Sequence, residues 1–380
     1  MELEQPKTTG PNWKQVALFL GLTFALTYLL DLVLFALGGL EHAAATQVLQ
    51  LQMLIPAGVA IVLQLFVFRD SPIYRAQGAA RWAFYLYLAL ALFFVLLTAV
   101  SLLAPNNIVL TVAGLATVAA SIGALVLMIL IRLVAGKEAF AEAGLSGGRW
   151  HHYALFGLAL VLIYGAMTGL NALFGLGQAV DVHMILSQAA GGEPTGVEQI
   201  PAGLLLLILG GQNLLLAPLL GLVIAFGEEY GWRSYLQGEL VRMGKIRGLL
   251  LVGVIWGLWH APIIAMGYNY PGYPLLGILL MTLYTIALAF FLGYAMFKSG
   301  SVWLVAYLHA LNNGTASFLI ALVYRPDSPV LSFGLGIYGM IVWAVVIAGL
   351  FLFDRKAWTS PPEVEWQAES DELVEELHHG

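Results

Sequence analysis

The chain of 380 residues contains no cysteine and few charged side chains. The missing cysteines exclude a disulfide scaffold, a thiolate metal site and a cysteine nucleophile. Only 10% of the residues are charged, whereas soluble domains approach a quarter, and 60% are apolar. A soluble fold of this composition cannot cover its apolar surface with a polar shell, so the composition excludes soluble enzyme folds for most of the chain and predicts a membrane protein.

The sequence also lacks a basic patch that could bind nucleic acid, and we expect no nucleic-acid partner. The net charge of −6 includes an acidic run from Glu363 to Glu376. Pro361 and Pro362 precede this run, and the segment 357–380 is therefore predicted to be a solvated acidic tail on the cytoplasmic side.

Long apolar runs recur along the rest of the chain. A helix crosses a bilayer with about 20 such residues. Ten candidate spans follow from this length, at about 15–38, 48–68, 82–104, 107–134, 153–176, 204–230, 247–266, 275–297, 301–323 and 332–353. The fold class predicted is therefore an all-α polytopic bundle of about eight to ten spans.

The positive charges predict how these spans are oriented. Of the 16 Lys and Arg residues, only Arg325 falls on the other side of the membrane from the rest if the spans alternate. Because Lys and Arg favour the cytoplasmic side, both termini are predicted to be cytoplasmic, and eight crossings would preserve this arrangement as well as ten.

Few titratable groups lie within the spans, and each one there needs a partner or a function. Glu228 and Glu229 end the span 204–230, and Arg233 follows four residues after Glu229, which favours a helical ion pair. Glu228 points away from that pair and is left for another role. The simpler interpretation is two carboxylates that reach the cytoplasmic interface.

Two later spans each carry a histidine with a partner one helical turn away. Trp256 precedes His260 by four residues, and His309 precedes Asn313 by four. Taken alone, either histidine is more typical of a hydrogen bond between helices than of catalysis. Estimated depths along the helices overlap for Glu228 and both histidines, which predicts one polar cavity open to the cytoplasm. Asp31 has no motif partner and is interpreted as an interhelical bond or a cavity edge.

These segments together resemble the CPBP intramembrane proteases, a family of type II CAAX prenyl endopeptidases and Abi-like bacteriocin-processing or immunity proteins. The family pattern is Glu-Glu-x-x-x-Arg, then an aromatic residue four before a His, then His-x-x-x-Asn or Asp. Here it reads Glu228-Glu229 with Arg233, Trp256 with His260, and His309 with Asn313. Trp256 stands where Phe is commoner, a change expected to preserve the packing, and ten spans exceed the usual eight-helix core.

The resemblance implies glutamate-based hydrolysis of a peptide bond in a membrane-associated substrate, either prenylated or not. Glu228, polarised by His260, is expected to activate water, while His309 and Asn313 stabilise the oxyanion. Glu229, Arg233 and Trp256 are expected to support the site. No cofactor is expected, and zinc held by one Glu and two His is the minority alternative.

The division of the chain follows from the same resemblance. Residues 1–200 are N-terminal spans of unassigned role, 201–325 the catalytic core, 326–356 the last span and 357–380 the tail. The expected location is the cell membrane, with peptide or protein substrate and membrane lipid as partners. Two alternatives remain open: a transporter or channel that uses the buried Glu and His groups as a proton or ion site, and a catalytically silent immunity protein.

Overall fold

The computed structural model describes residues 10–360 except 69–70, 72, 74–77 and 192–195. The acidic run and three of the cations used to orient the chain, Lys7, Arg69 and Arg75, lie outside the described residues. Helices dominate the described chain, which confirms the prediction of an all-α polytopic bundle.

The elements up to residue 199 are α1 Trp13–Ala36, η1 Gly39–Glu41, α2 Ala45–Val62, η2 Leu63–Val67, η3 Gly78–Arg81, α4 Trp82–Leu103, α5 Asn107–Ala135, α6 Lys137–Glu142, α7 Trp150–Leu173, β1 Gly177–Ala179, α8 Val182–Ala189 and η4 Val197–Gln199. The later elements are α9 Ala202–Gly211, η5 Gln212–Leu216, α10 Ala217–Leu220, α11 Leu222–Glu229, η6 Tyr230–Gln237, α12 Gly238–Leu240, η7 Val241–Met243, α13 Lys245–Trp259, α14 Ala261–Ala265, α15 Pro274–Ser299, α16 Val302–Phe318, η8 Leu319–Val323, β2 Tyr324–Pro326, α17 Ile337–Phe353 and α18 Arg355–Thr359.

Among the described residues, seven helices are long and apolar enough to cross a membrane, so the protein is a multi-pass membrane protein. They are Trp13–Ala36, Ala45–Val67, Gly78–Leu103, Asn107–Ala135, Trp150–Leu173, Ala202–Leu220 and Pro274–Ser299. The three remaining predicted spans, 247–266, 301–323 and 332–353, contain shorter helices. These are α13, α16 and α17, with 15, 17 and 17 residues.

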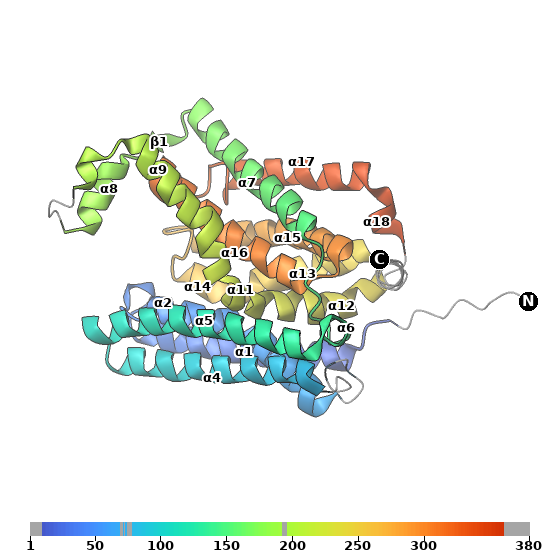
Figure 1. Ribbon diagram of the computed structural model, residues 1–380. Coiled ribbons are helices and arrows are strands. Elements are labelled where there is room, and N and C mark those ends of the chain that lie inside the picture. Colours follow the sequence, from blue (N-terminus) through green and yellow to red (C-terminus); the bar gives the residue numbers. More distant parts are fainter. Residues whose placement is uncertain (1–9, 69–70, 72, 74–77, 192–195, 361–380) are drawn as a thin grey trace, which may run out of the picture.

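The predicted span 204–230 is wrong in its bounds. The chain forms one candidate span that ends at Leu220 and, after Gly221, a second helical stretch from α11 to α12 that runs in another direction (Figure 1). Pro218 lacks an amide hydrogen for the helix ladder, and Gly221 is a weak helix former, which explains a break here. Glu228 therefore lies in a separate helix and not at the end of a span.

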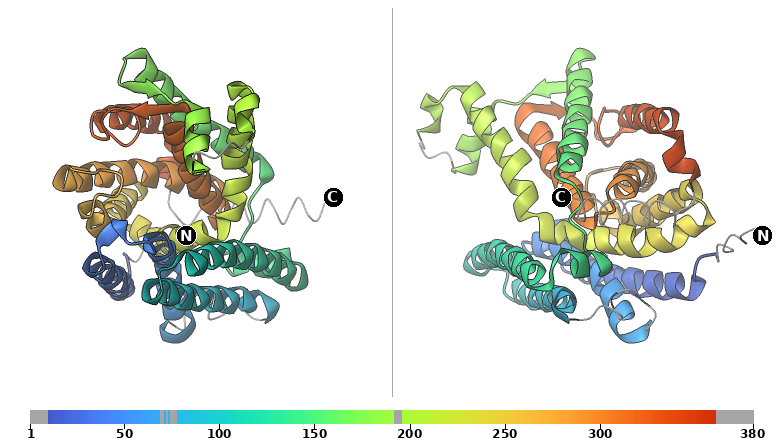
Figure 2. Two further views of the ribbon diagram at one scale, coloured as in Figure 1. Left: turned by 90° about the vertical axis from the view of Figure 1, so that its left-hand side faces the viewer. Right: turned by 45° about the vertical axis from the view of Figure 1, so that its right-hand side comes forward.

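The helices stack in layers (Figures 1 and 2). The helices α1, α2, α4 and α5 form one layer, and α11 packs on its α2. The helices α13, α15 and α16 form the middle of the molecule, and α7 and α17 cover them on the other side. The site described below lies between the first layer and the middle.

Glycine pairs four residues apart bring two of these helices close to their neighbours. A Cβ at Gly227 would lie 2.3 Å from Met53 O of α2, and a Cβ at Gly231 would lie 2.4 Å from Pro56 Cβ of the same helix. A Cβ at Gly253 or Gly257 would lie 2.4 or 2.5 Å from a Cα atom of α15. Both pairs are small-xxx-small patterns, which allow backbones to approach in membranes.

Two short strands stand outside the all-α prediction. β1 and β2 pair antiparallel with Gln178 opposite Arg325. A Cβ at Gly177 would lie 2.2 Å from Arg325 O, so this register needs a glycine there. The sheet ties the segment after α7 to the end of α16 through η8.

The chain folds back after α17. In α18, Ala357 and Trp358 are buried, and the Trp358 ring stacks on Tyr294 with centroids 5.6 Å apart. Lys245 Nζ donates a hydrogen bond of 2.8 Å to Ala357 O. The first residues assigned to the solvated tail thus pack against the bundle.

Candidate active site

The two adjacent carboxylates enter the protein interior from α11. Glu228 and Glu229 are 2% and 0% exposed. The helix continues through the wider π-helical turns of η6, a geometry that is rare and often found at functional sites. Gly227 and Gly231 anchor this stretch on α2, which fixes the side of the helix from which the carboxylates project.

Glu229 is the centre of a buried charge cluster. Its Oε2 lies 3.0 Å from Arg233 Nε, which confirms the ion pair predicted from the spacing. Its Oε1 lies 2.7 Å from His309 Nδ1 of α16. The guanidinium of Arg233 also lies over the Trp256 ring, 4.5 Å from its centroid. Glu229 therefore joins α16 to its own helix and sets the orientation of the His309 ring.

Glu228 is held by Trp256. The indole Nε1–H donates a hydrogen bond of 2.7 Å to Glu228 Oε2. Trp256 was expected to support the site, and this hydrogen bond is a support that Phe at the same position could not give, because Phe has no such donor. The other oxygen, Oε1, lies 4.0 Å from His309 Nε2, a gap that one water molecule can bridge.

The expected contact between His260 and Glu228 is not found among the hydrogen bonds and ion pairs of the described residues. His260 follows the last residue of α13, and its Nδ1 lies 2.8 Å from Trp256 O of the preceding turn. A backbone carbonyl only accepts, so Nδ1 carries a proton in this contact and Nε2 is the free acceptor of a neutral ring. His260 thus offers an acceptor nitrogen close to the Trp256 that holds Glu228.

The amide of Asn313 is oriented by residues that the sequence analysis missed. The hydroxyls of Tyr164 and Tyr284 lie 2.7 and 3.0 Å from Asn312 Oδ1 and 2.5 Å from each other, so this hydroxyl pair donates to the Asn312 oxygen. This leaves the Asn312 amide nitrogen as donor to Asn313 Oδ1, at 3.1 Å. The Asn313 nitrogen is consequently free to donate elsewhere. Asn312 adjoins the motif, but no local pattern marks the two tyrosines on α7 and α15.

All four predicted catalytic residues line one cavity of about 210 Å³. They are Glu228, His260, His309 and Asn313. Trp256 also lines the cavity, whereas Glu229 and Arg233 are buried but do not line it. The volume is enough for several water molecules.

The N-terminal layer contributes to the cavity as well. Gln52 of α2 lines it and donates through Nε2 to Asp31 Oδ1 of α1. The expectation of an interhelical bond for Asp31 is confirmed. Its amide oxygen, an acceptor, makes no hydrogen bond to the described residues.

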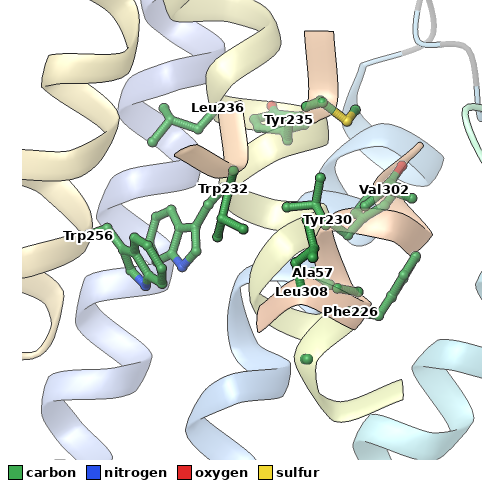
Figure 3. Close-up of a cluster of buried hydrophobic side chains, with 14 of the residues drawn as sticks. Ala57, Phe226, Tyr230, Trp232, Tyr235, Leu236, Trp256, Val302 and Leu308 are labelled. Atoms are coloured by element: carbon green, nitrogen blue, oxygen red, sulfur yellow. The ribbon is translucent and has the colours of Figure 1, made fainter. Parts of the chain in front are cut away.

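The cavity reaches one end of the bundle only. Its exposed lining residues include Tyr268 and Asn269, in the loop between α14 and α15. Asn269 has a positive φ of 60°, a conformation that asparagine tolerates better than most residues. Toward the other end lies a packed core of buried side chains that includes Trp232, Leu236 and Leu308 (Figure 3), and none of these three lines the cavity.

Two of the predictions therefore conflict. The end with this core is the end at which Lys245, Lys298 and Arg149 lie, and these are the cations that predict the cytoplasmic side. With that orientation the cavity opens to the opposite face, and not to the cytoplasm as expected. The orientation itself stays a prediction.

The described residues contain no group of three or more His, Asp or Glu side chains arranged to hold a metal ion. The expectation that no cofactor is needed stays a prediction. The buried cluster instead contains two carboxylates and one guanidinium, from Glu228, Glu229 and Arg233. A proton on His309 would balance the remaining negative charge, as buried charges require.

The comparison with known families agrees with the sequence motif. Residues 210–315 match the family described as type II CAAX prenyl endopeptidase Rce1-like. No curated protein and no solved structure matches the chain. The matched segment contains the four predicted catalytic residues and excludes Gln52 and Tyr164 of the N-terminal helices.

Proposed function

We propose that this membrane protein is an intramembrane endopeptidase with Glu228 as its general base, because residues 210–315 match the Rce1-like family of type II CAAX prenyl endopeptidases. The single observation that carries this proposal is the convergence of Glu228, His260, His309 and Asn313 on one cavity. Three separate helical segments supply these groups: α11, the end of α13, and α16.

Glu228 is arranged to activate water. Trp256 holds its Oε2 by a hydrogen bond of 2.7 Å, so Oε1 is the oxygen that faces a water in the 4.0 Å gap to His309 Nε2. The water gives one proton to Glu228 as its oxygen attacks the carbonyl carbon of the substrate. The free Nε2 of His260 accepts a hydrogen bond from the same water or the next one in the cavity.

Two donors suit the negative oxygen that forms in this step. Asn313 offers its amide nitrogen, because its oxygen is already bonded to Asn312. His309, with one proton on the Nδ1 that faces Glu229 and another on Nε2, offers the second donor. Donors that are fixed before reaction need no reorganisation when the charge develops.

The reaction then completes with groups already named. The tetrahedral intermediate collapses, the bond between carbonyl carbon and nitrogen breaks, and protonated Glu228 returns its proton to the leaving amine. The products are a carboxylic acid and an amine, the acid then passes its proton to the amine to give a carboxylate and an ammonium group, and the site regains its starting charge. Neither a metal nor a covalent intermediate is needed for this sequence of steps.

The substrate proposed is a peptide or protein associated with the membrane. The mouth near Tyr268 and Asn269 lies at one end of the bundle, where an extended segment can enter. Gln52 supplies an acceptor for a backbone N–H of that segment. Whether the substrate carries a prenyl group is one of the variables of the test.

The test is proteolysis by the full-length protein, purified in detergent, against paired peptide libraries with and without a C-terminal prenyl group. Preparations with Glu228→Gln, His260→Ala, His309→Ala and Asn313→Ala are compared with Glu41→Gln, which changes an exposed carboxylate outside the cavity. Each variant is first shown to have the thermal stability of a folded protein. We expect a loss of at least about 100-fold in the Glu228 variant, full activity in the Glu41 control and no effect of a chelator.

Other outcomes would change the assignment. Cleavage that the chelator removes would support the zinc alternative, and cleavage that survives Glu228→Gln would reject Glu228 as the base. If no library peptide is cleaved and ion flux appears in liposomes that contain the protein, the transporter alternative replaces the protease.

A further inference from the structure

A second cavity, of about 100 Å³, lies at the end of the bundle away from the mouth of the active site. Its charged lining is entirely basic and comes from three neighbouring segments. Arg132 lies in the last turn of α5, Lys137 begins α6, and Arg149 precedes α7. His152, the third residue of α7, completes the set.

These cations have no counter-charge in the described protein. No ion pair or hydrogen bond joins the side chains of Arg132, Lys137 or Arg149 to another described residue. The nearby acids Glu138 and Glu142 of α6 are exposed and do not line the cavity. Elsewhere at this end, Lys298 pairs with Asp354 at 3.3 Å. Like charges that face one cavity repel each other, and a bound anion removes that repulsion.

The loop that closes the cavity is held in place before any ligand arrives. Tyr153 and Ser301 donate hydrogen bonds of 2.8 and 2.9 Å to the carbonyls of Gly147 and Ser146. Gly148 has a φ of +67°, and a Cβ there would lie 2.8 Å from Ser301 Cβ. Only glycine fits this position, so the loop keeps a defined shape beside the cations.

Two further features favour an anion. His152 Nδ1 is buried and has no hydrogen-bond partner among the described residues. The cavity also lies at the N-terminus of α7, a helix of 24 residues, whose dipole and free N–H groups attract negative charge.

We propose that this cavity binds a phosphate group, and that the phosphate belongs to the headgroup of an anionic membrane lipid. Arginine recognises phosphate through paired N–H donors, and Arg132 and Arg149 supply two such groups. The apolar side chains beside the cavity, Leu133, Val134 and Trp150, are 67%, 78% and 80% exposed. Such a surface suits the acyl chains and the interfacial region of a lipid, not a free phosphate ion.

The test measures lipid binding by the full-length protein in nanodiscs. Phosphatidylcholine discs with and without phosphatidylglycerol are compared by the exchange of a fluorescent phosphatidylglycerol and by thermal unfolding. The double variant Arg132→Gln/Arg149→Gln is set beside Arg355→Gln/Lys356→Gln, which removes two exposed cations at the same end but outside the cavity. Arg149→Lys, which keeps the charge but loses the paired donors, serves as the milder variant.

We expect the wild-type protein to prefer phosphatidylglycerol and the cavity variant to lose that preference by about tenfold or more. The control variant should lose less than about threefold, and Arg149→Lys should fall between them. Equal losses in both double variants would overturn the proposal, because general attraction to the surface would then explain the binding. If the wild type shows no preference for phosphatidylglycerol, while inorganic phosphate in lipid-free detergent raises its unfolding temperature and not that of Arg149→Lys, the phosphate site stands and its lipid source is rejected.

Discussion

The helices α5 and α15 have almost the same hydropathy and opposite surroundings. The most apolar windows of their spans have mean hydropathies of 2.5 and 2.4, yet 17% of the first window and 61% of the second are buried inside the protein. Lipid tails are as apolar as a protein core, so apolar character alone cannot distinguish a helix that faces lipid from one that lies inside. The difference must come from features other than hydropathy.

Small residues at helix contacts are one such feature. Gly253 and Gly257 of α13 face the backbone of α15, and Gly227 and Gly231 of α11 and η6 face that of α2. On α5, Gly114 and Gly123 have open space where a Cβ would lie. A glycine therefore indicates a buried helix contact only where it faces the backbone of a neighbouring helix. The pairs beside Glu228 and Trp256 hold the two helices that carry the base and its donor.

The largest effect is expected from adding a side chain in one of these contacts. A Cβ at Gly257 would lie 2.5 Å from Thr282 Cα, so Gly257→Val must separate α13 from α15. We expect a loss of about 3 kcal/mol or more in stability, together with all activity. Thermal unfolding of the purified variants in detergent measures the first, and peptide cleavage the second.

The matched change on α5 is Gly114→Val, which meets only open space. Its stability should stay within about 0.5 kcal/mol of the wild type. If both valine variants unfold at the same temperature, the distinction between the two helices is wrong.

The features that the sequence predicted well are local. The span edges of α1, α5 and α15 follow from apolar length, and the Glu229–Arg233 pair follows from a spacing of four on one helix. The motif residues converge because the family pattern already encodes their relation. In each case the relevant information lies within one segment or one known pattern.

The features that the sequence did not predict depend on contacts between helices. Nothing near Tyr164 indicates that its hydroxyl lies 2.7 Å from Asn312 Oδ1, since 148 residues separate them. The predicted span 204–230 ran across the break after Pro218, because apolar residues continue on both sides of it. The direction in which the cavity opens depends on packing around Trp232, which no period along the chain reveals.

The second prediction concerns α7, a helix with a buried share of only 28% in its span window. Tyr164→Phe and Tyr284→Phe each leave one donor on Asn312 Oδ1, and each should reduce kcat by less than about threefold. The double variant frees the Asn312 amide to turn and misplaces Asn313. We expect a fall in kcat of about tenfold or more, with KM unchanged.

The background of Asn313→Ala separates this positioning role from a general loss of packing. Once Asn313 is absent, the two tyrosine changes should add no further loss of kcat. Tyr85→Phe on α4, whose hydroxyl makes no hydrogen bond to the described residues, is the control and should have wild-type kcat. A double variant that loses stability but keeps kcat would contradict the positioning role and show that the two tyrosines contribute only to packing.

A smaller effect is expected at Trp256. Trp256→Phe keeps an aromatic ring between Arg233 and the cavity but loses the 2.7 Å hydrogen bond to Glu228. We expect kcat to fall by about three- to tenfold, because the carboxylate keeps its place in the helix and loses only its orientation. Trp358→Phe loses a comparable bond, from Nε1 to Leu350 O, far from the site. It should lower the unfolding temperature and leave kcat unchanged, and equal kcat values in both variants would show that the indole donor is irrelevant to the reaction.

The smallest effect is expected at the water-facing end, where Asp354 follows α17. Burial acts to raise the pKa of this carboxyl, but hydrogen bonds from the Tyr294 hydroxyl and the Ala357 N–H and the charge of Lys298 lower the pKa below its ordinary value of 3.8. A lowered pKa in the folded state means that ionised Asp354 stabilises the fold above about pH 4 and that this contribution disappears as the pH falls through the folded-state pKa. Wild type should therefore be more stable than Asp354→Asn at pH 6 by less than about 1 kcal/mol, because the Lys298 side chain is 42% exposed. Thermal unfolding from pH 7 to pH 3 should show the two curves converging at the acidic end, and a difference that grows toward low pH would contradict the assignment. A small contribution from the partly exposed Lys298–Asp354 pair would contrast with the buried Glu229–Arg233 pair, which joins helices around the site. The charges at the end of the bundle would then matter little for the fold, whereas those in its interior organise it.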